Sequence, residues 1–200
     1  WLIDREKDKN NQEVICETEI CFVNREKEIE RIQKMIGEYS KYCFLIAAPE
    51  GYGKSHLLKK LQKEYSDDNW ICLSLPTEGQ IPNNLAELCK SLIKTNRKRS
   101  NEDSRKIGID FASAVLEDKK QLDIAPGIAI FLDAVDEYEE SITNNLPDFL
   151  LGFYRGLENG ISFFSSRSKK VAIFLAGFPS HKFLSIYNHL RNNEVESYII

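Results

Sequence analysis

The sequence predicts an α/β fold of three layers, with helices on both faces of a mostly parallel sheet of five strands. Two observations support this. Short apolar runs bounded by turn residues alternate along the chain with stretches that repeat apolar residues at helical spacing. The chain also has 200 residues, of which 42% are hydrophobic and 29% charged, as expected for one globular domain with a sizeable core. Strands that alternate with helices form βαβ units, so their sheet is expected to be parallel.

Each expected strand is an apolar run. The runs cover residues 42–47, 70–75, 128–133 and 170–176, and a fifth begins near Ser197. The third run is almost continuously apolar, which indicates a parallel strand that is buried on both faces of the sheet.

The spacing of apolar residues also predicts the helices. They cover about residues 25–38, the stretch that follows Lys54, and then 85–93, 107–121, 146–164 and 180–190. Three glycines leave open whether the long helix is interrupted, namely Gly152, Gly156 and Gly160. The polar stretch 94–106 is expected to be an exposed loop. Its basic residues leave a role in nucleic-acid binding open, but a solvated loop is favoured because no aromatic residue lies between the charges.

Both ends of the sequence look like cuts in a longer chain. It opens on Trp1 rather than Met and stops on the apolar run 198–200. Residues 1–20 are expected to form a linker or an extension from an upstream segment, and residues 21–200 to form the folded domain.

The overall charge and the cysteines narrow the class of protein. A net charge of −4 and an isoelectric point near 5.5 argue against a dominant nucleic-acid surface. The number of cysteines, five, is odd, and the sequence contains no C-x-x-C pair. Both observations favour a protein of the reducing cytoplasm. The sequence has no apolar run long enough to predict a membrane span, so no membrane partner is expected.

The stretch Ala48–Ser55 is the strongest chemical signal in the chain. It fits the pattern G-x-x-x-x-G-K-[ST] of a phosphate-binding loop, except that Ala48 stands at the first glycine position. It follows an apolar run and precedes a helical pattern, which is the context that such a loop needs. Glycines let the backbone approach a phosphate, and the helix N-terminus adds partial positive charge.

The loop and its flank supply the expected nucleotide contacts. Lys54 is expected to reach the β- and γ-phosphates and to assist catalysis, and the Ser55 hydroxyl to bind Mg²⁺. The expected nucleotide-binding residues in this part of the chain are Pro49, Glu50, Gly51, Tyr52, Gly53, Lys54, Ser55 and His56.

A second group of candidate residues follows the third expected strand. Asp133 lies where carboxylates face the phosphates in open α/β sheets, so we expect it to hold Mg²⁺ directly or through water. Asp136 or Glu137 is expected to orient or deprotonate the attacking water, and the division between them stays open. The alternative, that these acids only cap the next helix, is less favoured because they follow a phosphate loop and an apolar strand. After the fourth strand, Ser180 is expected to be a helix N-cap rather than a sensor of nucleotide.

Three motifs in this order resemble those of one ATPase class. Phe22–Glu26 resembles the F-V-G-R-E motif of AAA+ and STAND ATPases. Ala48–Ser55 resembles the A-P-x-G-Y-G-K-[ST] variant of Walker A that is common in STAND regulators, which also accounts for Ala48. Leu132–Glu137 resembles the h-D-x-x-D-E Walker B motif of the STAND class, including its NACHT branch.

The resemblance implies a P-loop ATPase with a five-stranded sheet of the additional-strand type, which binds ATP or ADP with Mg²⁺. It places Val23 and Arg25 beside the nucleotide base. Two features depart from the class: Asn24 replaces the usual glycine, and the tip of the fourth strand lacks the arginine found in many members.

The resemblance further implies a switch. ADP would hold a closed monomer, and ATP would favour self-association that activates an effector. Effector, lid and sensor domains would lie outside this chain. The sequence is therefore interpreted as the slowly hydrolysing ATPase module of a STAND-like signalling or defence protein. Two alternatives stay open: an AAA+ loader or origin-recognition-type ATPase that acts on DNA, and a nucleotide-binding scaffold that does not hydrolyse ATP.

Overall fold

The strands form one parallel sheet, as the sequence predicts. A computed structural model describes residues 25–36, 39–75, 81–93, 103–117, 124–160 and 169–200. The strands are β1 (Lys41–Ala47), β2 (Ile71–Ser74), β3 (Gly127–Leu132), β4 (Lys170–Gly177) and β5 (Glu196–Ile199). Their order in the sheet is β2-β3-β4-β1-β5, and every pair of neighbours is parallel. Strand β4 thus lies between β1 and β3, which is the additional-strand arrangement.

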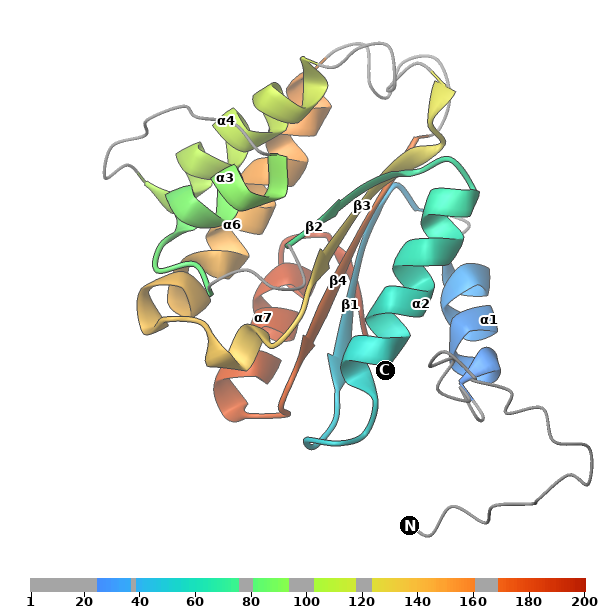
Figure 1. The fold of residues 1–200 in the computed structure, drawn as a ribbon. Helices are drawn as coiled ribbons and strands as arrows, with labels where there is room; N and C mark the ends of the chain where they lie inside the picture. The colour runs from blue at the N-terminus through green and yellow to red at the C-terminus, as the bar shows by residue number, and fades with distance from the viewer. Residues whose placement is uncertain (1–24, 37–38, 76–80, 94–102, 118–123, 161–168) are drawn as a thin grey trace, which may run out of the picture.

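Helices cover both faces of this sheet (Figure 1). One face packs against α1 (Glu26–Met35) and α2 (Lys54–Asp67). The other packs against α3 (Leu85–Ile93), α4 (Ser104–Leu116), α6 (Glu140–Asn159) and α7 (His181–Arg191). These helices complete the three layers that the alternation of strands and helices predicts.

A row of aromatic rings fixes the register of four strands. Phe131, Phe174, Phe44 and Tyr198 occupy paired positions on β3, β4, β1 and β5. Neighbouring rings stack with centroids 4.9, 5.1 and 5.4 Å apart. Because a slip of one residue would turn these rings to the other face, the row stabilises this register over its alternatives.

Several helices begin or end at residues that differ from the prediction; α6 begins at Glu140 and ends at Asn159, whereas the prediction covered 146–164. α4 begins at Ser104, because the Asp103 carboxylate accepts a hydrogen bond from the backbone N–H of Arg105 at 3.0 Å and caps the helix. The prediction of a loop through residue 106 was therefore wrong for its last part, and 94–102 lie outside the described residues. α1 ends at Met35, before the predicted residue 38.

The long helix α6 continues through Gly152 and Gly156 and ends at Asn159, with Gly160 as its C-cap. Gly152 and Gly156 lie where α4 crosses α6, and a Cβ built on Gly156 would be 2.6 Å from the Cβ of Ala112. A Cβ on Gly152 would collide with the backbone carbonyl of Arg105. These glycines allow the two helix backbones to approach closely.

The prediction for the tip of the fourth strand is confirmed in its helix cap. The side chain of Ser180 accepts a hydrogen bond from the N–H of Phe183 at 3.1 Å, so Ser180 is the N-cap of α7. Among the described residues, no helix combines the length and the apolar character needed to cross a membrane.

Candidate functional site: a phosphate-binding cleft

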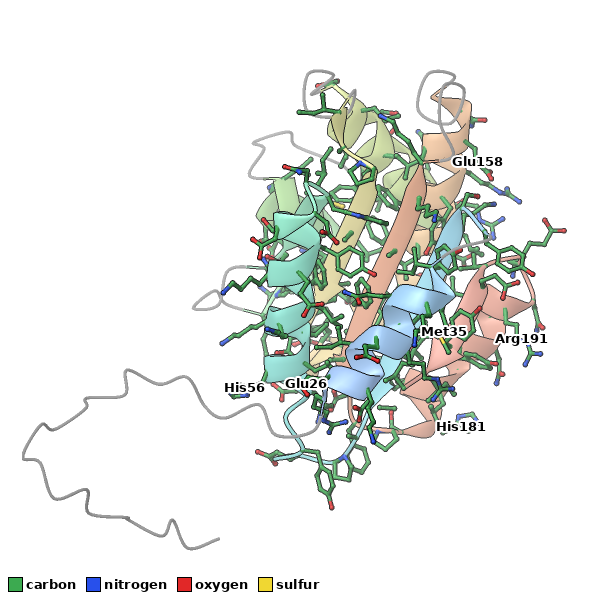
Figure 2. The ribbon with its side chains drawn as sticks, turned by 90° about the vertical axis from the view of Figure 1, so that its right-hand side faces the viewer. Glu26, Met35, His56, Glu158, His181 and Arg191 are labelled. Carbon is green, nitrogen blue, oxygen red and sulfur yellow. The ribbon has the colours of Figure 1, made fainter. Side chains whose placement is uncertain are left out.

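The parallel sheet brings the predicted motifs to one edge. The loop after β1, the acidic turn after β3 and Phe178 after β4 all follow the carboxyl ends of strands. Figure 2 shows that α1 and α7 also begin at this end of the molecule, where Glu26 and His181 lie near the level of His56 on α2. In open α/β sheets, ligands bind at this edge.

The loop after β1 has the backbone of a phosphate-binding loop. Gly51 and Gly53 have φ angles of 80° and 75°. Nothing lies within 4 Å of a Cβ built on either residue, so the requirement for glycine is conformational and not a lack of space. Gly53 is the N-cap of α2, so the N-terminus of that helix is directed at the loop and favours an anion there.

The amino group of Lys54 holds the loop closed on itself. It donates hydrogen bonds to the carbonyl oxygens of Ala48 at 2.8 Å and of Pro49 at 3.0 Å. An ammonium group has three donors, so one remains for a phosphate oxygen. The lysine is therefore placed to bind the loop and a phosphate together.

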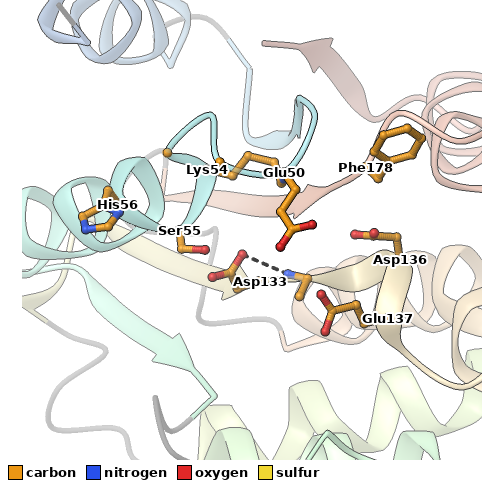
Figure 3. A pocket seen from close by; sticks show the side chains of 11 residues that line it. Glu50, Lys54, Ser55, His56, Asp133, Asp136, Glu137 and Phe178 are labelled. Carbon is orange, nitrogen blue, oxygen red and sulfur yellow. Dashed lines mark hydrogen bonds between the residues drawn. The ribbon is translucent and has the colours of Figure 1, made fainter. Parts of the chain in front are cut away.

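Loop and acidic turn enclose a cleft of about 510 Å³. Its lining includes nine of the predicted site residues: Glu50, Gly51, Gly53, Lys54, Ser55, His56, Asp133, Asp136 and Glu137. Figure 3 shows the side chains of Ser55, Glu50 and Asp133 converging on this cleft. The structure thus brings together the two groups of residues that the sequence placed far apart.

The remaining predicted residues lie elsewhere. Pro49 and Tyr52 belong to the loop but do not line the cleft. Arg25 also lies outside the lining: its guanidinium donates to the carbonyl oxygen of Tyr52 at 2.8 Å and pairs with Glu28 at 3.0 Å. Val23 lies outside the described residues.

A short turn aims the acidic residues into the cleft. Asp133 follows β3, and its Oδ1 accepts a hydrogen bond from the backbone N–H of Ala134 at 2.9 Å. Ala134 has a φ of 49°, which reverses the chain into the 3-10 helix η1 (Val135–Glu137). Val135 is fully buried and anchors the turn, so Asp136 and Glu137 face the cleft.

Comparison with known families identifies the domain. Residues 25–178 match the model of the KAP family P-loop domain. The chain belongs to this family. The matched residues contain the loop after β1, the acidic turn and the tip of β4.

Similarity to individual proteins is weaker than the match to the family. No curated protein matches this KAP domain. Among solved structures, it is similar to the Aeropyrum pernix ORC2 protein in its ADPNP–ADP complexes, with 11% sequence identity and a TM-score of 0.48. The match covers 89% of this chain and 48% of that one, so the chain spans about half the length of ORC2.

The cleft of this KAP domain is strongly acidic. Four carboxylates line it, from Glu50, Asp133, Asp136 and Glu137, against one lysine. No cluster of three or more His, Cys, Asp or Glu side chains in the described part of the chain is arranged to hold a metal ion. Mg²⁺ commonly uses one or two protein ligands together with substrate phosphates, and a hydroxyl beside a carboxylate fits that pattern.

Three residues near the cleft escaped the sequence analysis. Phe178 lines the cleft with half of its surface exposed, and Gly177 before it packs against Asp136. Both lie at the carboxyl end of a strand, where ligands collect in open α/β sheets, but neither has a polar side chain that would mark it as a candidate. The third is Tyr138, whose phenol pKa is raised first by burial and then by the charge of Asp133. No sequence signal marks a buried phenol beside a carboxylate.

Proposed function

We propose that this KAP domain binds ATP or ADP with Mg²⁺ and hydrolyses ATP slowly, as a switch. The observation that supports this is the single cleft in which Lys54 and Ser55 of the phosphate loop face Asp133 across the ends of β1 and β3. A helix N-terminus, a lysine and two oxygen ligands are what Mg²⁺-bound phosphates need.

Each residue has a role in this proposal. Ser55 and Asp133 would hold Mg²⁺, which neutralises charge on the phosphates. Lys54 would give its remaining donor to a phosphate oxygen. Asp136 and Glu137 would orient the attacking water or accept its proton. Gly51 and Gly53 would let backbone N–H groups reach the phosphates.

The charge of the cleft supports slow hydrolysis by the isolated chain. No arginine is among the residues that line the cleft within the described part of the chain. Phosphoryl transfer gains about 10³–10⁵ in rate from an arginine that stabilises the transition state. In a STAND-like switch, a second copy that associates on ATP binding would supply such a group, and fused effector and sensor domains would respond. Residues 1–20 would then be the link to an upstream segment, and 21–200 the ATPase domain.

Calorimetric titration with Mg²⁺-ATP tests the binding half of this proposal. Hydrogen bonds to charged groups contribute about 1.5–3 kcal/mol, so Lys54→Ala should weaken binding by about ten- to a hundredfold. The control is Lys59→Ala, because Lys59 is exposed on the same helix and lies outside the cleft. Equal affinities for Lys54→Ala and the wild type would contradict the phosphate site.

Turnover assays distinguish the switch from its two alternatives. Phosphate release that rises on addition of duplex DNA would favour an ATPase that acts on DNA. ATP binding without any release, even in the full-length protein, would favour a scaffold. A slow release that depends on protein concentration and not on DNA is the result expected of the switch.

A further inference from the structure

The guanidinium of Arg25 joins helix α1 to the phosphate loop. Its Nη2 donates a hydrogen bond to the carbonyl oxygen of Tyr52 at 2.8 Å, and its Nη1 pairs with the Glu28 carboxylate at 3.0 Å. Arg25 is the N-cap residue of α1, and the buried side chains of Ile29 and Ile32 pack this helix against the sheet. The loop is thus held from outside the cleft by a side chain at the start of a packed helix.

The second half of the loop, residues 51–53, has few other restraints in the described part of the chain. Gly51 and Gly53 have positive φ angles, and nothing lies within 4 Å of a Cβ built on either residue. The side chain between them, Tyr52, is 62% exposed. Lys54 holds only the first half of the loop, through two carbonyl oxygens. Because glycines tolerate many backbone conformations, the peptide between Tyr52 and Gly53 could turn over at low cost without the bond from Arg25.

The hydrogen bond from Arg25 sets the direction of a backbone donor. Peptide bonds in the described ranges are trans, so the carbonyl of Tyr52 and the N–H of Gly53, which share one peptide plane, point in opposite directions. Gly53 lines the cleft and Arg25 does not. A carbonyl held toward Arg25 therefore turns the Gly53 N–H away from α1 and toward the cleft. This N–H makes no hydrogen bond to any described residue, so it can donate to a ligand.

We propose that Arg25 is a positioning residue for nucleotide phosphates, because it fixes the Tyr52–Gly53 peptide so that the Gly53 N–H can donate to a phosphate oxygen. This inference rests on the proposed function, since it takes the loop as the phosphate site. A hydrogen bond from a backbone N–H to an anionic oxygen is charge-assisted. A donor that is already oriented binds more tightly than one that must first be ordered, because ordering costs free energy on binding.

The test compares Mg²⁺-ATP with Mg²⁺-tripolyphosphate, which carries phosphates but no base or ribose. Both are titrated as competitors of a fluorescent ATP analogue. Arg25→Ala should weaken both ligands by the same factor, about three- to tenfold, because one oriented hydrogen bond is lost in each case. The matched control is Arg31→Ala, since Arg31 is exposed on the same helix and lies outside the cleft. This control should leave both affinities unchanged.

A second variant acts on the same contact from the other side of the guanidinium. Glu28→Ala removes the acceptor of Nη1 and leaves the bond to Tyr52 possible, so it should weaken both ligands by a smaller factor than Arg25→Ala. In an Arg25→Ala background it should have no further effect, because the two residues act as one unit. The Arg25 side chain is 32% exposed, so the Tm of Arg25→Ala without nucleotide should stay close to that of the wild type.

The outcomes separate this inference from the proposed function. Unchanged affinity of Arg25→Ala for both ligands, with normal binding by the wild type, would overturn the role of Arg25 alone. A loss for ATP without a loss for tripolyphosphate would overturn it as well, since it would place the guanidinium at the base or ribose. The same holds if tripolyphosphate does not compete on the wild type, because the affinity for ATP would then not come from the loop. Absence of Mg²⁺-ATP binding by the wild type would overturn both proposals.

Discussion

A Cβ built on Gly177 would lie 2.7 Å from Oδ1 of Asp136. The end of β4 thus packs directly on the carboxylate that η1 aims into the cleft, and the Phe183 ring closes the other side at 3.1 Å. No side chain fits at position 177 while Asp136 keeps this place. After β4, Phe178 lines the cleft, and Gly177 leaves room for the Asp136 carboxylate beside it.

Gly177→Ala should therefore act through Asp136. The added methyl group displaces the carboxylate, so turnover should fall by about tenfold or more, within the range that a misplaced acid–base group costs. ATP affinity should change less than turnover, because the added methyl group meets Asp136 and Phe183, whereas the phosphate loop contacts Gly177 only through the hydrogen bond from the Ala48 N–H to its carbonyl oxygen at 3.4 Å. Steady-state phosphate release and calorimetric ATP titration measure the two quantities.

A double-mutant cycle controls for a general loss of structure. If Gly177→Ala acts by moving Asp136, it should reduce turnover much less in an Asp136→Asn background, since the group it displaces is already altered. Fully additive losses would show that the methyl group damages the site in another way.

The sequence was sufficient to predict features that depend on local pattern. Each strand is an apolar run, and the phosphate loop has a strict spacing, so both could be located from neighbours in the chain. The sheet order follows from the resemblance to additional-strand ATPases, and the structure confirms it. The parallel sheet then determines that Ser55 and Asp133 meet, because both follow carboxyl ends of strands.

Features that depend on contacts between distant segments could not be predicted in this way. The contact of Gly177 with Asp136 joins β4 to the turn after β3, and neither segment signals it alone. The start of α4 depends on one capping carboxylate, Asp103, within a polar stretch that resembles a loop. The phenol of Tyr138 is buried and has no hydrogen-bond partner among the described residues. Its burial could not be predicted, because the spacing of apolar residues does not indicate burial for a residue that follows a turn.

Gly152→Ala tests the close approach of α4 and α6. The new Cβ would meet the backbone carbonyl of Arg105, which cannot move aside without shifting the helix. Overpacking of this kind costs about 1–3 kcal/mol, so Tm should fall by roughly 2–12 °C for a domain of this size. Gly160→Ala is the control, because its Cβ would overlap the flexible end of Leu116 and would lie at ordinary contact distance, 3.4 Å, from the nearest backbone atom, the carbonyl oxygen of Leu157. Equal Tm values for the two variants would contradict the packing account.

A comparison of ATP with GTP distinguishes two roles for Arg25, contact with the nucleotide base and support of the phosphate loop. If Val23 and Arg25 lie beside the base, ATP should bind more tightly than GTP, because a mismatched polar edge leaves groups unpaired. If Arg25 only braces the loop through Tyr52, then Arg25→Ala should weaken ATP and GTP by the same factor. Competition titrations with both nucleotides measure this. Equal affinity of the wild type for ATP and GTP would count against the position beside the base.

The rate of hydrolysis decides whether this domain is a switch. The cleft holds the carboxylates needed for metal binding and water positioning, but no arginine among its described lining residues. Transition-state charge on the phosphoryl group is then stabilised by Lys54, Mg²⁺ and the backbone N–H groups of the loop, without an arginine, so a monomer should hydrolyse ATP slowly. Association with a second copy should raise the rate by bringing a cation to the open side of the cleft.

Two substitutions should separate the catalytic role of Glu137 from the metal-binding role of Asp133. Glu137→Gln removes an interaction that matters only in the transition state, so it should lower even the slow monomer rate and leave ATP affinity nearly intact. Asp133→Asn should instead weaken the Mg²⁺ dependence of binding, because it removes negative charge from the metal ligand. Phosphate release measured across protein concentration, together with ATP titrations at several Mg²⁺ concentrations, checks both. Fast turnover that does not depend on protein concentration would contradict the switch, because it would show that the monomer already contains every group that the transition state needs.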